Sequence, residues 1–286
     1  MKIIDAHMHL SRIEEFQRTA DELSKVDYSV KGLLQEYAQH GVVLGIGMGL
    51  AETKAEGFPD AEAHNPMVLD LVDDLPASIA YCIGINPYQC DEEAWARIEL
   101  ELKKPQAVGL KLYLGYYPFY AFDSVYDRVY ELAAKYEVPV VFHCGDTYSE
   151  RGLLKYAHPL TIDEVAVKHR DVTMMMAHFG DPWVLDGAEV VYKNRNVYAD
   201  LSGLLVGDSR RFARLDEESP LFFQHLRHAI VYCDRYDKLL FGTDWPLAPI
   251  GTYIDFVKTV IPERHHEDVF YHNALQVFPK IRPQVR

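Results

Sequence analysis

Two histidines near the start of the chain, His7 and His9, have the spacing expected of two metal ligands on one β-strand. Alternate residues of a strand point to the same side and lie roughly 6.6 Å apart, at about 3.3 Å per residue. Two imidazoles held in this way can bind one cation, because little backbone freedom is then lost on binding. The same pattern also fits one exposed and one core histidine, so other residues must decide between them.

Three more polar residues, His143, His178 and Asp244, each end a short apolar run that is typical of a buried strand. We expect each of them at the last position of its strand. In a closed barrel of parallel strands, these carboxyl ends meet at the rim where active sites are built. With His7 and His9, these residues predict that four strands converge on one polar site.

Lys111 lies in an apolar run that is also predicted to be a strand. If Lys111 faces the barrel interior, alternation places Val108, Leu110 and Leu112 against the helices. A buried ammonium group is costly without a partner, which favours a chemical role for Lys111. The alternative is a core lysine that reaches solvent or pairs with a carboxylate.

The elements that would position these residues recur regularly along the chain. The apolar runs predict eight strands, at 2–9, 41–48, 79–86, 107–113, 138–143, 172–178, 196–201 and 239–244. The segments between them have helical periodicity, as in the stripe from Val30 to Ala38 and in 124–136, where Ser124 is the expected N-cap. This alternation predicts a single (β/α)8 TIM barrel over residues 1–286, with insertions at about 10–28 and 202–219. The first insertion follows the strand of His7 and His9 and is a candidate lid.

Composition narrows the classes of partner. The 286 residues include 43 acidic and 29 basic side chains, a net charge of −14, which disfavours binding to nucleic acid or to an anionic membrane. The longest weakly polar stretch, 41–51, is too short to span a membrane. The four cysteines form no CxxC pair and are too few for a disulfide scaffold, which predicts a cytoplasmic protein. A small-molecule substrate is the expected partner, and a homodimer stays open.

The ordered set of motifs resembles the amidohydrolase superfamily. It is most similar to the amidohydrolase-related (amidohydrolase 2) family, which includes enzymes like aminocarboxymuconate-semialdehyde decarboxylase. The motifs, in chain order, are HMH at 7–9, GLKLY at 109–113, His143, AHFG at 177–180, NVYADLSG at 196–203 and FGTDWP at 241–246. The resemblance runs from the first strand to the helix around 273–275, nearly the whole chain.

The resemblance implies a distorted barrel with a catalytic divalent metal, commonly zinc. The ligands that it implies are His7, His9, His143 and Asp244. His178 matches a histidine that binds a second metal in some relatives and acts as an acid, a base or an electrostatic clamp in others. Lys111 lies where some relatives carry a carbamylated lysine that bridges two metals and others keep a plain lysine near the substrate. We expect one tightly bound ion, with a second one left open.

The chemistry of these residues supports the same reading. Imidazoles and a carboxylate suit zinc, and a bound cation lowers the pKa of water to about 7. Asp244 or His178 would take a proton from this water and return it to the leaving group. Lys111 is predicted as a third catalytic residue. We therefore expect a metal-dependent hydrolase of an amide, lactone or ester in a small carboxylated substrate, which Tyr113 and Arg151 would help to bind. The alternatives are a nonoxidative decarboxylase with the same site and a catalytically silent barrel that binds a metal or a partner.

Overall fold

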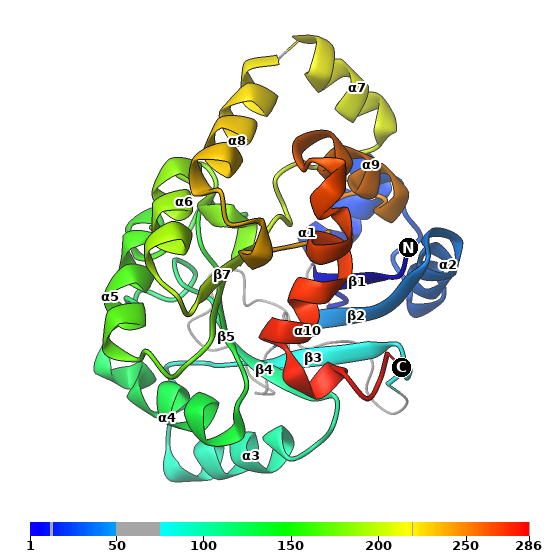
Figure 1. Cartoon of the computed structure of the whole chain (residues 1–286). Coiled ribbons are helices and arrows are strands. Elements are labelled where there is room, and N and C mark those ends of the chain that lie inside the picture. The colour runs from blue at the N-terminus through cyan, green and yellow to red at the C-terminus, as the bar shows by residue number, and fades with distance from the viewer. Residues whose placement is uncertain (12–13, 50–74, 219, 286) are drawn as a thin grey trace.

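Eight parallel strands form the centre of the molecule in the computed structural model, which describes residues 1–11, 14–49, 75–218 and 220–285 (Figure 1). Each strand pairs with the next one in chain order. Backbone hydrogen bonds from Ala6 N to Phe241 O (2.9 Å) and from Asp244 N to His7 O (2.8 Å) join the last segment to the first. The strands are β1 Ile3–Met8, β2 Val42–Met48, β3 Ile79–Gly84, β4 Ala107–Leu112, β5 Val140–Phe142, β6 Met174–Met176, β7 Val197–Asp200 and β8 Leu239–Leu240. The fold is a (β/α)8 TIM barrel, as the sequence predicts.

Helices surround the strands (Figure 1). They are α1 Glu14–Thr19, α2 Val30–His40, α3 Glu92–Leu102, α4 Asp127–Tyr136, α5 Leu160–Lys168, α6 Val184–Lys193, α7 Ser209–Glu218, α8 Pro220–Cys233, α9 Ile250–Val260 and α10 Asn273–Val277. Ser29 caps α2 by accepting a hydrogen bond from Gly32 N, and Gly41, with φ 72°, ends it. Ser124 is not the N-cap that the sequence predicts, because it begins a 3₁₀ turn, Ser124–Tyr126, that precedes α4.

Two hydrophobic layers hold the barrel together. Alternate residues of the strands, among them Ile4, Leu44 and Val141, pack inside it against Phe278, which follows α10. The other strand residues, such as Leu110 and Leu112, pack in the layer that contains the helices. Because these layers take opposite faces of each strand, they also fix which side chains can reach the interior.

Val108 differs from the sequence prediction, which places it against the helices. It packs in the interior layer instead. Tyr81 of β3 pairs with Ala107 and the next residue, Cys82, pairs with Gly109, so β4 carries one extra residue at Val108. Such a bulge reverses the alternation on one side of it, and Lys111 still faces the interior.

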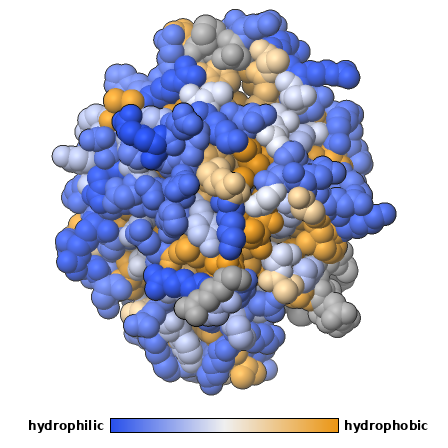
Figure 2. Space-filling model, turned by 45° about the vertical axis from the view of Figure 1, so that its right-hand side comes forward, coloured by the Kyte–Doolittle hydropathy of each residue, from blue (hydrophilic) through white to orange (hydrophobic). Residues whose placement is uncertain are grey.

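The surface is mostly hydrophilic on the face seen in Figure 2, with hydrophobic residues gathered in a band near its centre. Within the described parts of the chain, no helix is both long enough and apolar enough to cross a membrane.

Candidate active site

The polar residues predicted at strand ends lie at the carboxyl end of the barrel, although the strands are shorter than predicted. His143 follows the last residue of β5, His178 lies two residues beyond β6, and Asp244 lies four residues beyond β8. His178 and Asp244 have φ values of 61° and 55°, in the left-handed region. Tight turns, rather than the alternation of a strand, therefore aim these two side chains.

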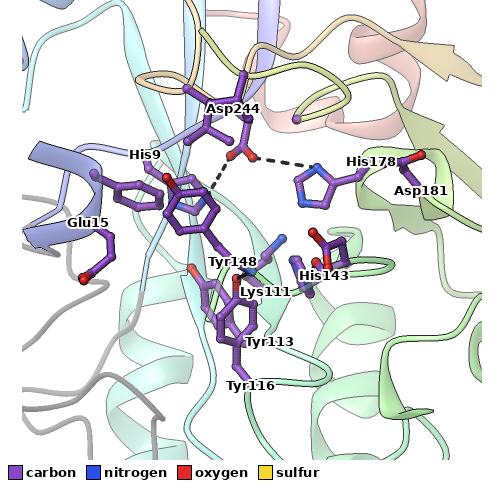
Figure 3. A pocket seen from close by; sticks show the side chains of 15 residues that line it. His9, Glu15, Lys111, Tyr113, Tyr116, His143, Tyr148, His178, Asp181 and Asp244 are labelled. Atoms are coloured by element: carbon purple, nitrogen blue, oxygen red, sulfur yellow. Dashed lines mark hydrogen bonds and ion pairs between the residues drawn. The ribbon is translucent and has the colours of Figure 1, made fainter. Parts of the chain in front are cut away.

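These side chains meet at a cavity of about 130 Å³ (Figure 3). His9, Lys111, His143, His178 and Asp244 line it. Aromatic residues complete much of its wall: Phe16, Tyr113, Tyr116 and Tyr148. Of the predicted site residues, Arg151 is exposed and does not line the cavity among the described residues, so its role in substrate binding stays a prediction.

His7, His9 and Asp244 form a buried group that fits a divalent cation. Asp244 Oδ1 lies 3.6 Å from His7 Nε2 and 3.1 Å from His9 Nε2. These separations resemble the roughly 3.3 Å between neighbouring ligands of a tetrahedral zinc ion with bonds of about 2 Å. Within the described part of the chain, His7 Nε2 and Asp244 Oδ1 are buried and have no hydrogen-bond partner. Two lone pairs that point to one place without a donor are what a cation would satisfy.

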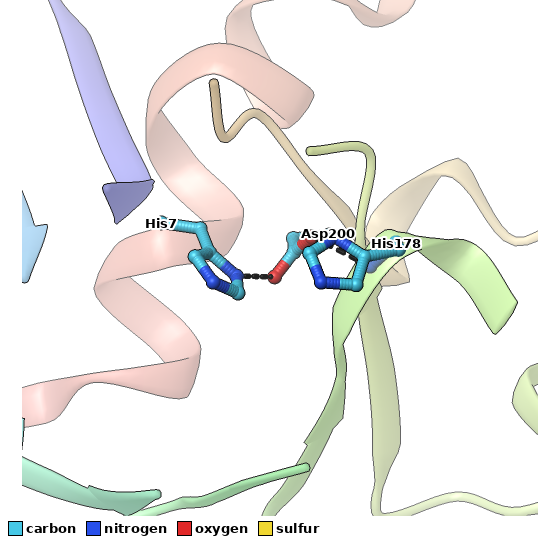
Figure 4. Close-up of side chains that lie close together, drawn as sticks. All are labelled: His7, His178 and Asp200. Atoms are coloured by element: carbon cyan, nitrogen blue, oxygen red, sulfur yellow. Dashed lines mark hydrogen bonds and ion pairs between the residues drawn. The ribbon is translucent and has the colours of Figure 1, made fainter. Parts of the chain in front are cut away.

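Asp200 orients the first of these ligands, and the sequence analysis assigned it no role. Its Oδ2 accepts a hydrogen bond of 2.8 Å from His7 Nδ1, and both side chains are fully buried (Figure 4). Burial lowers the pKa of His7 to about 4, so the ring is neutral at pH 7. Its one proton therefore lies on Nδ1, and Nε2 keeps the lone pair that faces Asp244. The available signal was an acidic residue one position before the end of a predicted strand, close to the signal that selected Asp244.

Asp200 also organises His178 through its other oxygen. Oδ1 accepts hydrogen bonds from His178 N (2.9 Å), Ser202 N (3.1 Å) and Ser202 Oγ (2.5 Å). Burial raises the pKa of Asp200, but its interactions with His7, including the hydrogen bond, and the hydrogen bond from Ser202 outweigh burial and hold that pKa well below its usual range. The carboxylate is thus ionised and accepts the one hydrogen bond that the hydroxyl of Ser202 can donate.

The tautomer of His178 follows from this network. Its Nδ1 lies 3.1 Å from Ser202 O and 3.0 Å from Ser202 Oγ. A carbonyl oxygen only accepts, and the hydroxyl already donates its one hydrogen bond to Asp200, so Nδ1 carries a proton and is the hydrogen-bond donor. His178 Nε2 is left with a lone pair for proton transfer at the cavity.

Replacing Ser202 with alanine should weaken this tautomer preference. In ¹⁵N spectra of the imidazole rings, we expect His178 of the wild-type protein to be protonated at Nδ1. The Ser202→Ala variant should show a mixed population, since one hydrogen bond contributes about 1 kcal/mol. The Ser202→Thr variant keeps the hydroxyl and should restore the wild-type signal. An unchanged His178 signal in Ser202→Ala would contradict the role of the hydroxyl and leave the Ser202 carbonyl oxygen as the acceptor that fixes the tautomer.

A second cluster, His7, His178 and Asp200, also has ligand-type atoms within 4.8 Å of one another. The hydrogen bonds from His7 Nδ1 and from the backbone N of His178 already occupy the carboxylate of Asp200. This cluster is therefore satisfied as a hydrogen-bond network and does not need a cation.

Comparison with known proteins identifies the family of the chain. The family model described as Amidohydrolase matches residues 4–280 of the chain. This chain belongs to the amidohydrolase family. No curated protein matches it significantly.

Solved structures share the fold of this amidohydrolase. A probable 2-pyrone-4,6-dicarboxylic acid hydrolase from Acinetobacter baumannii, with citric acid bound, is 15% identical, with a TM-score of 0.65 over 98% of this chain and 100% of that one. An amidohydrolase from Burkholderia multivorans with bound zinc is 17% identical, with a TM-score of 0.66 over 98% and 99%. The 2,6-dihydroxybenzoate decarboxylase from Rhizobium is 16% identical, with a TM-score of 0.63 over 98% and 99%. Hydrolases and decarboxylases thus share this barrel.

His143 lines the cavity of the amidohydrolase but lies outside the group of His7, His9 and Asp244. Its Nε2 donates a hydrogen bond of 2.8 Å to the backbone oxygen of Asp146, since a carbonyl cannot donate. Its ring centroid lies 5.1 Å from that of His178. His143 as a metal ligand therefore stays a prediction.

Lys111 reaches the cavity from β4 with only 1% of its surface exposed. Its Nζ has no hydrogen-bond partner among the described residues and lies 5.4 Å from the ring centroid of Tyr113. Burial lowers the pKa of Lys111 to about 8, although the charges of Asp200 and Asp244 oppose this shift. Lys111 therefore carries a positive charge at pH 7 without a direct anionic contact.

Asp5 holds the segment that carries Asp244. Its two oxygens accept hydrogen bonds from Thr243 N (2.9 Å) and Thr243 Oγ1 (2.7 Å). The backbone N of Trp245 donates to Thr243 Oγ1 at 3.0 Å, and Glu36 of α2 accepts from the Trp245 indole at 3.1 Å. The residues on both sides of Asp244 are thus fixed from behind the barrel wall, which favours one orientation of its carboxylate.

The segment predicted as a lid covers part of the site. It forms α1 and the π-helical turn Ala20–Ser24, while residues 12–13 lie outside the described residues. Phe16 stacks on His9, with ring centroids 4.9 Å apart, and Thr19 Oγ1 forms a hydrogen bond with Tyr148 OH. These contacts join the segment after β1 to the loop after β5 and screen His9 from water.

Proposed function

We propose that this amidohydrolase is a metal-dependent hydrolase of small substrates that carry a carboxylate. The observation that supports it best is the buried group of His7, His9 and Asp244 beside His178. The group suits one divalent cation, and we propose zinc, which is also bound in the Burkholderia amidohydrolase. A cation held there supplies a Lewis acid that polarises a carbonyl group and acidifies water.

His178 and Asp244 share the proton transfers in this proposal. His178 Nε2 accepts the proton of the attacking water as hydroxide adds to the substrate carbonyl carbon. Asp244 Oδ2 lies 3.9 Å from His178 Nδ1 and stabilises the imidazolium that results. His178 then returns the proton to the leaving nitrogen or oxygen as its bond to the carbonyl carbon breaks. Asp244 thereby has two roles, with Oδ1 toward the ligand histidines and Oδ2 toward His178.

Lys111 anchors the substrate carboxylate in this proposal. It is a buried cation that lines the cavity, whereas Arg151 is exposed. An ion pair formed inside a cavity is screened less than one at the surface. Tyr113 and Phe16 offer flat apolar walls to the rest of the substrate.

Decarboxylation is the second candidate, and the aromatic walls of the cavity favour it because they suit a planar aromatic acid. The Rhizobium neighbour acts on such an acid. In this alternative, His178 Nε2 would first take a proton from water and then give it to the ring carbon as carbon dioxide leaves. Both candidates use the same side chains, so the products must separate them.

Two measurements test the proposed function. Protein purified without added metal should hold about one divalent ion per chain, and a chelator should remove both the ion and the activity, with zinc restoring them. Carboxylated lactones, esters and amides should be cleaved by the metal-loaded protein, with water incorporated into the product. Release of carbon dioxide from aromatic acids while all of these bonds stay intact would instead establish the decarboxylase. A metal-free protein with full activity would contradict both candidates.

A further inference from the structure

The charges around the cavity are arranged in two zones. Among the residues the structure describes, Lys111 is the one lysine or arginine that lines the cavity. On another part of the wall lie two carboxylates outside the proposed catalytic group, those of Asp146 and Asp181. Figure 3 shows Asp181 beside His178, away from Lys111. A substrate whose carboxylate binds Lys111 therefore extends toward a wall of negative charge.

The segments that carry Asp146 and Asp181 are joined by their backbones. Asp146 follows β5 and Asp181 follows β6, and Asp146 N donates a hydrogen bond of 2.7 Å to Asp181 O. Gly145, with φ 107°, allows this contact, because a Cβ at that position would lie 2.0 Å from Asp181 O. The two backbones are thus locked together at the cavity wall.

Neither carboxylate has a cationic partner in the described part of the chain. Glu15, the other acidic residue that lines the cavity, differs because Arg18 NH2 lies 3.7 Å from its carboxylate. Asp181 is partly buried, and burial together with the charge of Asp146 raises its pKa, with His178 opposing the shift. A positively charged group between Asp146 and Asp181 would relieve this repulsion.

We propose that this amidohydrolase selects dipolar substrates, with a carboxylate bound by Lys111 and a protonated amine bound by Asp146 and Asp181. The inference rests on the proposed function for the position of the carboxylate. It adds a second recognition site that accepts ammonium groups and rejects a second carboxylate. Like charges placed in contact disfavour the wrong ligand more strongly than a missing contact would.

Binding of matched probes tests this inference without any turnover. The probes are 3-(aminomethyl)benzoate and isophthalate, which share a benzoate and differ in an ammonium against a second carboxylate. In titration calorimetry with the zinc-loaded protein, we expect 3-(aminomethyl)benzoate to bind at least tenfold more tightly. The Asp146→Asn/Asp181→Asn variant should lose most of this difference, and Lys111→Met should weaken the binding of both probes.

Glu164→Gln on the exposed surface of α5 is the matched control and should keep the wild-type ratio. Equal or tighter binding of isophthalate, or a tenfold difference that survives in the double variant, would overturn the inference. Because Asp146 is exposed, Asp146→Asn alone should fold normally and reduce the ratio in part. Hydrolysis of carboxylated esters by a protein that prefers isophthalate would overturn this inference alone. The expected preference without any hydrolysis would support it and contradict only the proposed reaction.

Discussion

The Asp244→Asn variant is expected to lose the metal ion and nearly all turnover. The amide keeps the shape of the side chain but removes the charge that a cation shares with His7 and His9. It also removes the partner that stabilises protonated His178, whose Nδ1 lies 3.9 Å from Asp244 Oδ2. We expect metal content to fall below about a tenth of an ion per chain and kcat/KM to fall by at least about 10³-fold. Elemental analysis and rate measurements on the same preparation check both numbers.

Asp186→Asn, on the exposed face of α6, is the matched control and should keep both metal and activity. Far-UV circular dichroism separates a loss of ligand from a loss of fold. An Asp244→Asn protein that retains the ion but not the activity would show that Asp244 acts on the proton and is not a ligand. A fully active variant would contradict the whole site.

The Lys111→Met variant is expected to be more stable and less able to bind substrate. Lys111 is fully buried, and its pKa near 8 compares with 10.5 for an ordinary lysine, so its charged form costs the folded state roughly 3 kcal/mol at pH 7. Methionine has a similar length and no charge, so the free energy of unfolding should rise by up to that amount. KM for a carboxylated substrate should rise roughly 100-fold, while a neutral analogue should be affected little.

The difference in the free energy of unfolding between the Lys111→Met variant and the wild-type protein should depend on pH. Below about pH 8 lysine is protonated in both states, and the penalty in the wild-type protein is complete. Between about pH 8 and 10.5 the unfolded chain holds more protons, so wild-type stability rises with pH relative to the variant. Above about 10.5 the penalty disappears. Urea unfolding of the metal-free proteins from pH 6 to 11 checks this, with Lys31→Met on the exposed face of α2 as the control. A difference that does not change with pH would contradict a charged Lys111.

The local hydrophobic pattern of the sequence predicted much of the fold. Period-two apolar runs predicted the strands, and helical stripes such as that of α2 predicted the helices between them. These patterns depend on which face of an element avoids water, a property that neighbouring residues determine. The predicted strands are longer than the observed ones, because an apolar residue can be buried in a turn as well as in a strand. The bulge at Val108 could not be predicted from the sequence either, since only the pairing with β3 shows the extra residue.

The sequence by itself was also enough to select most of the site residues. They lie at the ends or on the interior faces of predicted strands: His7, His9, His178, Asp244 and Lys111. Only the tertiary structure showed that Asp200 fixes His7 across 193 residues, that Ser202 fixes the tautomer of His178, and that Asp146 lies against Asp181. The reason is physical. Periodicity reports the environment of one element, whereas the direction of a hydrogen bond between distant residues depends on the closure of the barrel and on the turns that follow its strands.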